Sequence, residues 1–278
     1  MQDLKEWKGA SAPAPVTLRG RYVTLDPLDA ARHTSALWQA VRGHDELWTW
    51  LPEGPHEDEA ALKAAIEKKQ NGRDAVFLAI VPIATGLAAG WASLMRPDPA
   101  NGVVEVGNIL YSPLLQRTRE ATEAMYLMAR HVFEELGYRR YEWKCNALNE
   151  PSRRAAARLG FTFEGIFRQH MVVKGQNRDT AWFSMLDSEW PARKQAFEAW
   201  LEPGNFDEAR ETKAGAQLLT GRSRLSREMM ERPSPLQAVP SPLLSRSSLK
   251  FQRCSHCFNF VSAVSASRLN DIPKFPST

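Results

Sequence analysis

The chain has 278 residues, of which 43% are hydrophobic and 24% are charged. This composition excludes collagen-like, wholly disordered and disulfide-scaffold proteins, and the length allows one large domain with a buried core. No apolar run approaches the roughly 18 residues that a membrane span requires. The three cysteines are too few for a disulfide framework, so a reducing, cytoplasmic setting is expected.

Charge and aromatic residues are distributed unevenly along the chain. The net formal charge of +4 consists of +5 in residues 192–278 and −1 in residues 1–191. Nothing in the main body therefore indicates a nucleic-acid surface. All nine tryptophans lie at or before Trp200, whereas residues 221–278 contain twelve serines and six prolines. This pattern predicts one folded domain followed by a disordered extension.

The first part of the chain combines strand patterns with two helical patterns. Alternating or continuous apolar runs predict strands, and apolar residues at helical spacing predict helices. The predicted elements are a strand over 16–26 with a turn at Gly20, a helix over 30–41 capped by Asp29, a helix over 57–69, and strands over 75–81, 86–95 and 103–111.

A long amphipathic helix follows over residues 121–136, and Gly137 ends it. The later predicted elements are a strand over 140–146, a short helix over 149–160 and a hairpin of strands over 161–173 and 178–186. A long helix between two strands indicates a crossover, which makes part of the sheet parallel. The fold class expected is therefore α+β, with a mixed, twisted sheet.

The loop before the long helix is the first candidate for ligand binding. The free backbone N–H groups and partial positive charge of a helix N-terminus favour a pyrophosphate. Arg117 and Arg119 add two positive charges at this point. The alternative interpretation is that both arginines only solvate an exposed helix start.

Two segments, VEVGNILYSPLLQRTREATEA and LGYRRYEWKCNALNEPSRRAAARLGFTFEG, together resemble the GNAT superfamily of acetyl-CoA-dependent N-acetyltransferases. Within it, the RimJ/RimL-like branch, whose members acetylate protein N-terminal α-amines, is the most similar. The resemblance covers residues 15–191 and implies the GNAT acyl-CoA N-acyltransferase fold there. Residues 192–220 are then a C-terminal helix or linker, and residues 221–278 the disordered extension.

One position departs from the family's phosphate loop, which is usually Gln/Arg-x-x-Gly-x-Gly/Ala. Gln116 takes the first position and Ala121 the last, but Arg119 stands where the glycine is usual. Either the Arg119 guanidinium assists from a backbone that still fits, or binding of the cofactor is weakened. We favour the first, because arginines beside two phosphates are electrostatically complementary.

The resemblance also implies which residues contact acetyl-CoA, the expected cosubstrate. Asn149 would hydrogen-bond the pantetheine, and Ser152 would be a catalytic proton donor near the thioester sulfur. The alternative for these two residues is a helix N-cap and an N3 position. The backbone of Ile109, Leu110 and Tyr111 would pair with the pantetheine arm, and the amides of Gln116, Arg117, Thr118, Arg119, Glu120 and Ala121 would hold the pyrophosphate.

Acetyl transfer to an amine requires a neutral nucleophile, so a catalytic base is expected. Glu105 is the first candidate because it shares a strand face with mostly apolar residues; a cross-strand ion pair with lysine or arginine is the alternative. His170 is the second candidate, although a lone strand histidine is often structural. Trp48 and Trp50 are predicted to form an apolar wall of the acceptor pocket, or simply to belong to the core.

The sequence thus predicts an N-acetyltransferase acting on a primary amine, either a small molecule or a protein N-terminus. The alternatives are a non-catalytic acyl-CoA-binding module of the same fold and an acetyltransferase for a polyamine or antibiotic. Cys254, His256 and Cys257 have the spacing of half a zinc site, but no second ligand pair accompanies them, so no metal is expected. A monomer and a homodimer both stay open.

Overall fold

A computed structural model describes residues 4–206 of the chain. The chain divides into two compact units, Met1–Arg227 and Glu228–Thr278, and the second unit lies outside the described residues. The predicted extension over 221–278, with its Cys254–Cys257 cluster, also lies outside them. Within the described part, no helix has the length and apolar character to cross a membrane.

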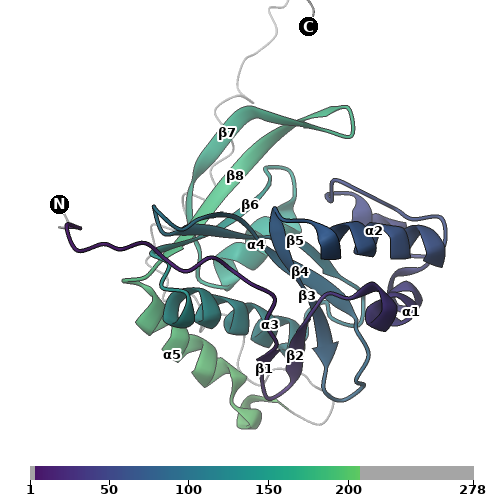
Figure 1. The fold of residues 1–278 in the computed structure, drawn as a ribbon, viewed down its shortest axis with the longest axis horizontal. Helices are drawn as coiled ribbons and strands as arrows, with labels where there is room; N and C mark the ends of the chain where they lie inside the picture. Colours follow the sequence, from purple (N-terminus) through teal and green to yellow (C-terminus); the bar gives the residue numbers. More distant parts are fainter. Residues whose placement is uncertain (1–3, 207–278) are drawn as a thin grey trace, which may run out of the picture. The chain divides into compact units, whose positions relative to one another are not determined.

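One eight-stranded sheet forms the centre of the described part of the chain. Its strands are β1 (Leu18–Arg19), β2 (Val23–Pro27), β3 (Ala75–Pro82), β4 (Gly90–Asp98), β5 (Val103–Tyr111), β6 (Arg140–Asn146), β7 (Thr162–Val173) and β8 (Gln176–Leu186). They are ordered β1-β2-β3-β4-β5-β6-β8-β7 (Figure 1). Within residues 4–206, β5 and β6 are the only parallel neighbours. The predicted mixed α+β sheet is therefore confirmed.

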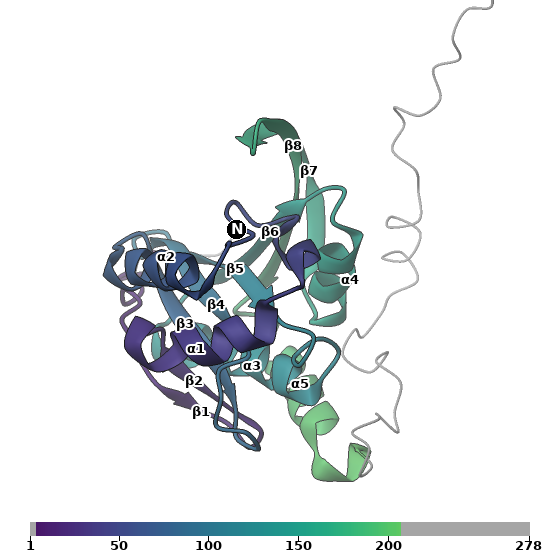
Figure 2. The same ribbon diagram turned by 90° about the vertical axis from the view of Figure 1, so that its right-hand side faces the viewer.

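Helices cover the two faces of the sheet. The α-helices are α1 (Ala30–Val41), α2 (Glu59–Asn71), α3 (Arg119–Arg130), α4 (Glu150–Arg158) and α5 (Trp190–Leu201), and the short ones are η1 (Asp45–Trp48), η2 (His131–Glu135) and η3 (Pro203–Asn205). Figure 2 shows α1 and α2 on one side of the sheet and α3, α4 and α5 on the other. The β7–β8 hairpin projects beyond the end of the sheet at the top of Figure 1.

Local signals explain where the helices begin and end. Asp29 caps α1 as predicted, because its side chain accepts a hydrogen bond from the Arg32 N–H at 2.8 Å. The predicted long helix is α-helical only to Arg130 and then continues as the π-helical turn η2, with a bond from the Leu136 N–H to the His131 carbonyl. The apolar stripe continues through both parts, so periodicity alone does not distinguish them.

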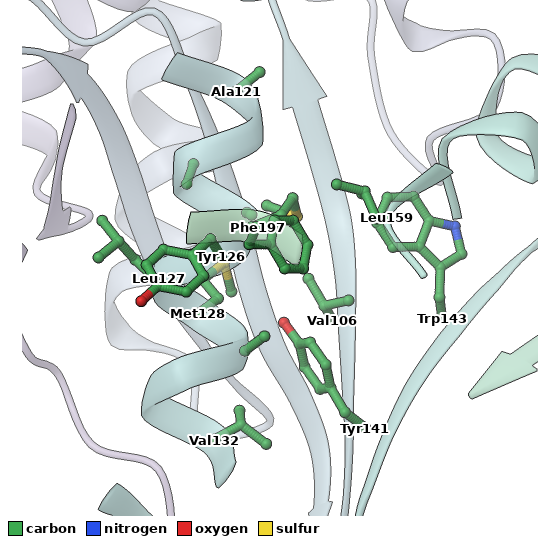
Figure 3. Packing of buried hydrophobic residues seen from close by; sticks show 14 of the residues in the cluster. Val106, Ala121, Tyr126, Leu127, Met128, Val132, Tyr141, Trp143, Leu159 and Phe197 are labelled. Carbon is green, nitrogen blue, oxygen red and sulfur yellow. The ribbon is translucent and has the colours of Figure 1, made fainter. Parts of the chain in front are cut away.

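The core lies mainly between the sheet and α3. One cluster joins α3, α4 and α5 to the sheet, and a second, smaller cluster joins α1 and α2 to the opposite face (Figure 3 shows part of the first). Trp190, Phe197 and Trp200 of α5 belong to the first cluster, and so does Phe206. The core therefore continues past residue 191.

Glu123 ties the start of α3 to the turn between β1 and β2. Its buried carboxylate accepts hydrogen bonds from the backbone N–H groups of Arg21, Tyr22 and Val23 at 2.6–2.8 Å. A Cβ atom on Gly20 would lie 2.5 Å from the Glu123 Cδ, so this close approach requires glycine. The carboxylate thus fixes the N-terminal half of α3 against the sheet.

Candidate functional site

The parallel strands β5 and β6 separate part-way along their length. Their pairing ends at Val106 and Trp143, although β5 stays paired with β4 up to Tyr111 and β6 with β8 up to Asn146. The backbone of β5 after Val106 therefore has no strand partner on its β6 side. Such unpaired backbone can pair with an extended ligand inserted between the two strands.

A bulge bends β5 just beyond this separation point. Trp91 pairs with Leu110 and Ser93 with Gly107, so two residues of β5 lie opposite one of β4. Asn108 in the bulge adopts a φ of 51°, and its side-chain amide donates to the Ser93 Oγ at 3.2 Å. The bulge thus falls in the part of β5 that has no β6 partner, which includes the predicted Ile109.

Tyr111 connects the end of β5 to the first turn of α3. Its hydroxyl donates a hydrogen bond to the Ala121 carbonyl at 3.2 Å. Burial raises the pKa of Tyr111, although the nearby Arg158 guanidinium opposes this, so the phenol stays protonated and can donate. Leu110 is buried in the α1–α2 cluster. The predicted residues of β5 thus hold the strand end next to the helix start.

The loop before α3 ends in a capped helix N-terminus. Thr118 is the N-cap, and its Oγ accepts from the Ala121 N–H at 3.2 Å. Gln116 donates its side-chain amide to the Tyr111 carbonyl at 3.1 Å. Arg117 is exposed and forms no ion pair within residues 4–206. Its cationic side chain is thus available beside a helix end that favours anions.

The backbone of Arg119 does not adopt the conformation that favours glycine. The residue of this loop with a left-handed φ, 63°, is Arg117, while Arg119 is the first residue of α3. The Arg119 guanidinium lies 4.3 Å from the ring centroid of Tyr22 and 5.5 Å from that of Phe206. The Arg119 Nε also lies 3.4 Å from the buried Glu120 carboxylate. The arginine in the glycine position is therefore part of an aromatic and acidic packing contact.

The N-terminus of α4 lies beside the other strand of the separation. Asn149 is the N-cap, and its side-chain oxygen accepts from the Ser152 N–H at 3.1 Å. The Ser152 Oγ accepts a hydrogen bond from the Trp143 Nε1 at 3.0 Å. The capping interpretation of Asn149 and the N3 position of Ser152 are confirmed. A ligand-binding role for either residue stays a prediction.

Glu105 forms the cross-strand ion pairs that the sequence left as an alternative. It is 3% exposed, and its Oε2 lies 2.7 Å from the Arg96 Nη1 and 3.1 Å from the Lys144 Nζ. Lys144 also contacts the Glu142 carboxylate at 2.6 Å and lies 3.9 Å over the Trp182 ring. The carboxylate proposed as a base is thus surrounded by two cations.

These contacts belong to a longer ion-pair chain across the sheet. Arg140 joins Glu142 at 2.6 Å to Glu164 at 2.5 Å, and Glu164 also accepts from the Ser184 hydroxyl. Arg140 holds the pKa of Glu164 below its ordinary value. Three cations and three carboxylates alternate in this ion-pair chain. In order, they are Arg96, Glu105, Lys144, Glu142, Arg140 and Glu164. Their charges balance, so this part of the sheet is polar but neutral.

His170, in β7, lies on the same face of the sheet as this ion-pair chain, next to the end of β6. A bulge in β7 puts residues 168–170 opposite one residue of β8. The His170 Nδ1 lies 3.0 Å from the Oγ1 of Thr180, which pairs with Asn146, the last residue of β6. The His170 side chain is exposed and makes no ion pair within the described residues. Its role as a catalytic base stays a prediction.

The two tryptophans predicted for the acceptor pocket differ in their surroundings. Trp48 is 2% exposed and belongs to the α1–α2 core cluster, whereas Trp50 is 39% exposed. The loop that contains them contacts the tip of the β7–β8 hairpin, because the Lys174 Nζ donates to the carbonyls of Trp48 and Gly54 at 2.9 and 3.1 Å. Trp50 is thus the more accessible of the two side chains.

Comparison with known proteins identifies the family. Residues 23–162 match the acetyltransferase (GNAT) domain, which is half of the chain. The chain belongs to the GNAT acetyltransferase family. The predicted superfamily and fold are thereby confirmed.

Solved structures of GNAT proteins are similar over most of the described residues. A GCN5-related N-acetyltransferase from Brucella melitensis has 50% sequence identity and a TM-score of 0.76, covering 78% of this chain and 99% of that one. A "probable acetyltransferase (GNAT family)" from Chromobacterium violaceum ATCC 12472 has 42% identity and a TM-score of 0.65, covering 69% and 96%.

A curated relative agrees with the predicted RimJ/RimL-like branch. It is the "Putative ribosomal N-acetyltransferase YdaF" of Bacillus subtilis (strain 168), which is 28% identical over 178 residues. The match covers 61% of this chain and 92% of that protein.

Three side chains of this GNAT domain were not singled out from the sequence. Trp143 contacts Ser152, Lys174 joins the hairpin to the early loop, and the Arg158 Nη1 donates to the Thr122 Oγ at 3.3 Å. Burial lowers the pKa of Arg158, which has no carboxylate partner within residues 4–206. Arg158 lies in the segment ARLGFTFEG, which carried part of the family resemblance. The segment does not show that the Arg158 side chain contacts Thr122.

A hollow of about 340 Å³ lies beside the early helices, and neither predicted tryptophan is among its lining residues. It is lined by Trp38, Arg42, Gly43, Asp45, Pro55, His56 and Glu57. Burial lowers the pKa of His56, whose ring packs edge-on against Trp48. Trp48 and Trp50 do not line this hollow, so the acceptor role of either tryptophan stays a prediction.

Proposed function

We propose that this protein transfers an acetyl group from acetyl-CoA to a primary amine, with protein N-terminal α-amines as the acceptor class. The separation of β5 from β6 between two capped helix N-termini is the observation that carries the proposal. It provides unpaired backbone for an extended arm, a cationic helix end for phosphates and a hydroxyl for the leaving sulfur.

The chain's residues fit the chemical groups of acetyl-CoA, which would supply the activated thioester. The backbone of Ile109 and Tyr111 is available to the pantetheine arm on the unpaired side of β5. The first turn of α3 offers N–H groups that no residue of its own helix can satisfy, and the exposed Arg117 adds charge. Asn149 and Ser152, at the start of α4, would contact the pantetheine and the thioester sulfur from the other side.

The choice of acceptor follows from the free energy of deprotonation. An α-amine has a pKa of about 7.7–8.0 and costs about 1 kcal/mol to deprotonate at pH 7, whereas a lysine costs about 4–5 kcal/mol. A modest base is sufficient for the α-amine. The name of the relative YdaF, "Putative ribosomal N-acetyltransferase", supports a protein acceptor.

His170 is the better supported of the two predicted bases. Glu105 is 3% exposed and its Oε2 contacts two cations, so little of the carboxylate is accessible to a substrate. His170 is exposed on the same sheet face and its contact with Thr180 orients the ring. We therefore assign proton acceptance from the amine to His170, directly or through water, and a positioning role to Glu105.

Calorimetric titration with acetyl-CoA, followed by mass spectrometry of acetylated products, tests the proposal. We expect micromolar binding and acetylation of peptides with free α-amines. Acetylation of polyamines instead of peptides would indicate the small-amine alternative. Binding of acetyl-CoA without any acetyl transfer would indicate a non-catalytic module. Absence of binding to acetyl-CoA would contradict the proposal as a whole.

A further inference from the structure

Ser152 is held by two independent hydrogen bonds. Its backbone N–H donates to the Asn149 side chain at 3.1 Å, and its Oγ accepts from the Trp143 Nε1 at 3.0 Å. The first bond fixes the start of α4. The second fixes the hydroxyl oxygen itself, and a helix cap alone does not require it.

The donor in the second bond determines how the hydroxyl is used. An indole N–H can only donate, so the Ser152 oxygen must act as the acceptor in this contact. One lone pair of the oxygen is therefore occupied, so the hydroxyl acts as a donor in its other contact, for which Cys145 is the neighbouring acceptor when no ligand is bound. A hydroxyl in this state is arranged to give a proton rather than to receive one.

Trp143 is itself held rigidly at the separation point of the two strands. It forms the last pair of the parallel ladder with Val106 and is 6% exposed. Its ring packs against Phe161 with centroids 5.6 Å apart, and Leu159 lies beside it (Figure 3). The indole N–H therefore has a fixed position, as a positioning group requires.

We propose that Trp143 is the positioning residue that orients the Ser152 hydroxyl toward the leaving sulfur, an inference that rests on the proposed function. The amine nitrogen bonds to the acetyl carbon while the carbon–sulfur bond breaks. Ser152 donates its proton to the sulfur and recovers one from solvent. The proton lost by the amine passes through His170 to solvent, so charge and atoms balance.

The buried Cys145 thiol is a second neighbour of the Ser152 hydroxyl. Burial raises the pKa of the Cys145 thiol, and the Ser152 hydroxyl opposes that rise by hydrogen bonding. Cys145 lies two residues after Trp143 on β6, on the same side of the strand. The region around Ser152 is thus compatible with a sulfur acceptor.

A double-mutant cycle tests the proposal with acetyl-CoA and a library of peptides bearing free α-amines. We expect Ser152→Ala to lower kcat about 100-fold. Trp143→Phe should lower kcat about tenfold with the KM for acetyl-CoA unchanged. In the Ser152→Ala background, Trp143→Phe should have no further effect, because Trp143 acts through the hydroxyl.

Trp190→Phe is the matched control. Trp190 is 5% exposed, and its Nε1 donates to the Glu134 carboxylate at 2.9 Å, so the variant removes an equally buried indole donor elsewhere. It should lower the melting temperature as Trp143→Phe does but leave kcat unchanged. If Trp143→Phe does not fold, benzothienylalanine at the same position removes the N–H and retains the ring shape.

Two results would overturn the positioning role. One is an unchanged kcat in the folded Trp143 variant, and the other is an equal loss of kcat with and without Ser152. Wild-type protein that binds acetyl-CoA but acetylates no peptide contradicts the proposed function itself, and the role of Trp143 with it. These outcomes separate failure of the inference from failure of the function.

Discussion

The two helix N-termini on either side of the strand separation differ in their chemistry. At the start of α3 an exposed cation, Arg117, lies next to the Thr118 cap, and no carboxylate pairs with it within the described residues. At the start of α4, Asn149, Ser152 and Trp143 satisfy one another without any net charge. A helix end with a cation that has no carboxylate partner within residues 4–206 is suited to bind an anion. The α4 end, where Glu150 pairs with Arg153 and Arg154 and Trp143 donates to Ser152, is instead suited to orient a single proton. Similar local structure therefore supports two different tasks.

The substitution with the largest expected effect removes the Glu123 carboxylate, which anchors the N-terminal half of α3 to the sheet. Glu123→Gln leaves the carboxylate's three N–H partners facing one amide oxygen and one NH₂ group. We expect a loss of about 3 kcal/mol in the free energy of unfolding, measured by urea denaturation.

Glu135→Gln is the control for this loss, because the Glu135 side chain is 52% exposed and its change should remain within about 0.5 kcal/mol. Equal effects of the two substitutions would show that the buried carboxylate does not anchor α3.

The second prediction separates the two arginines of the α3 end. Arg117→Ala should weaken acetyl-CoA binding about tenfold, which corresponds to about 1.4 kcal/mol, because its charge is the one free to meet a phosphate. Arg119→Ala should instead lower stability by about 1 kcal/mol through loss of its contact with the Tyr22 ring. Calorimetry and thermal melting distinguish the two. A reversed pattern would assign phosphate binding to Arg119.

The third prediction compares the two caps directly. Thr118→Ala and Asn149→Ala each remove one side-chain acceptor from a helix start, so each should cost about 1 kcal/mol of stability. Thr118→Ala should also raise the dissociation constant for acetyl-CoA, whereas Asn149→Ala should mainly lower kcat by loosening Ser152. If both variants change the same kinetic constant, the division of tasks between the two helix ends is wrong.

Much of the fold could be predicted because its signals are local. The bounds of α1 and β5 follow from a cap and an apolar pattern, and the crossover between β5 and β6 follows from the order of elements. The contacts of Glu105 could not be predicted in the same way. They depend on the register that puts Glu105 beside Glu142 of β6, and a shift of one residue would turn the side chain to the other face.

The site was predictable to the level of segments rather than contacts. The loop before α3 and the start of α4 were singled out from motif and spacing, but the left-handed φ of Arg117 and the Trp143–Ser152 bond were not. Apolar and polar residues alternate along the strand around Trp143, and this pattern indicates only that the ring is buried. The packing of α4 decides which polar atom the ring reaches, and that atom belongs to Ser152, nine residues further along the chain.

The smallest effect concerns pH and a histidine distant from both helix ends. Burial, with a contribution from Arg32, lowers the pKa of His33, and its Nδ1 accepts the Asp29 N–H at 3.0 Å, so the folded protein holds the ring neutral. The unfolded chain binds a proton below about pH 6.5, whereas the folded chain resists it. Stability should therefore be fully present above that pH and fall on acidification. His56, whose pKa is also lowered, contributes with the same sign.

Melting temperatures recorded between about pH 7.5 and about pH 5.5 measure this slope. His33→Asn retains an acceptor for the Asp29 N–H but cannot titrate, so it should flatten the curve without lowering the neutral-pH melting temperature greatly. A wild-type melting temperature that rises on acidification would contradict the assignment of a neutral ring. Because neither histidine contacts the strand separation, the same titration should leave the ratio of the Arg117→Ala and Arg119→Ala binding constants unchanged, which confines the pH effect to stability.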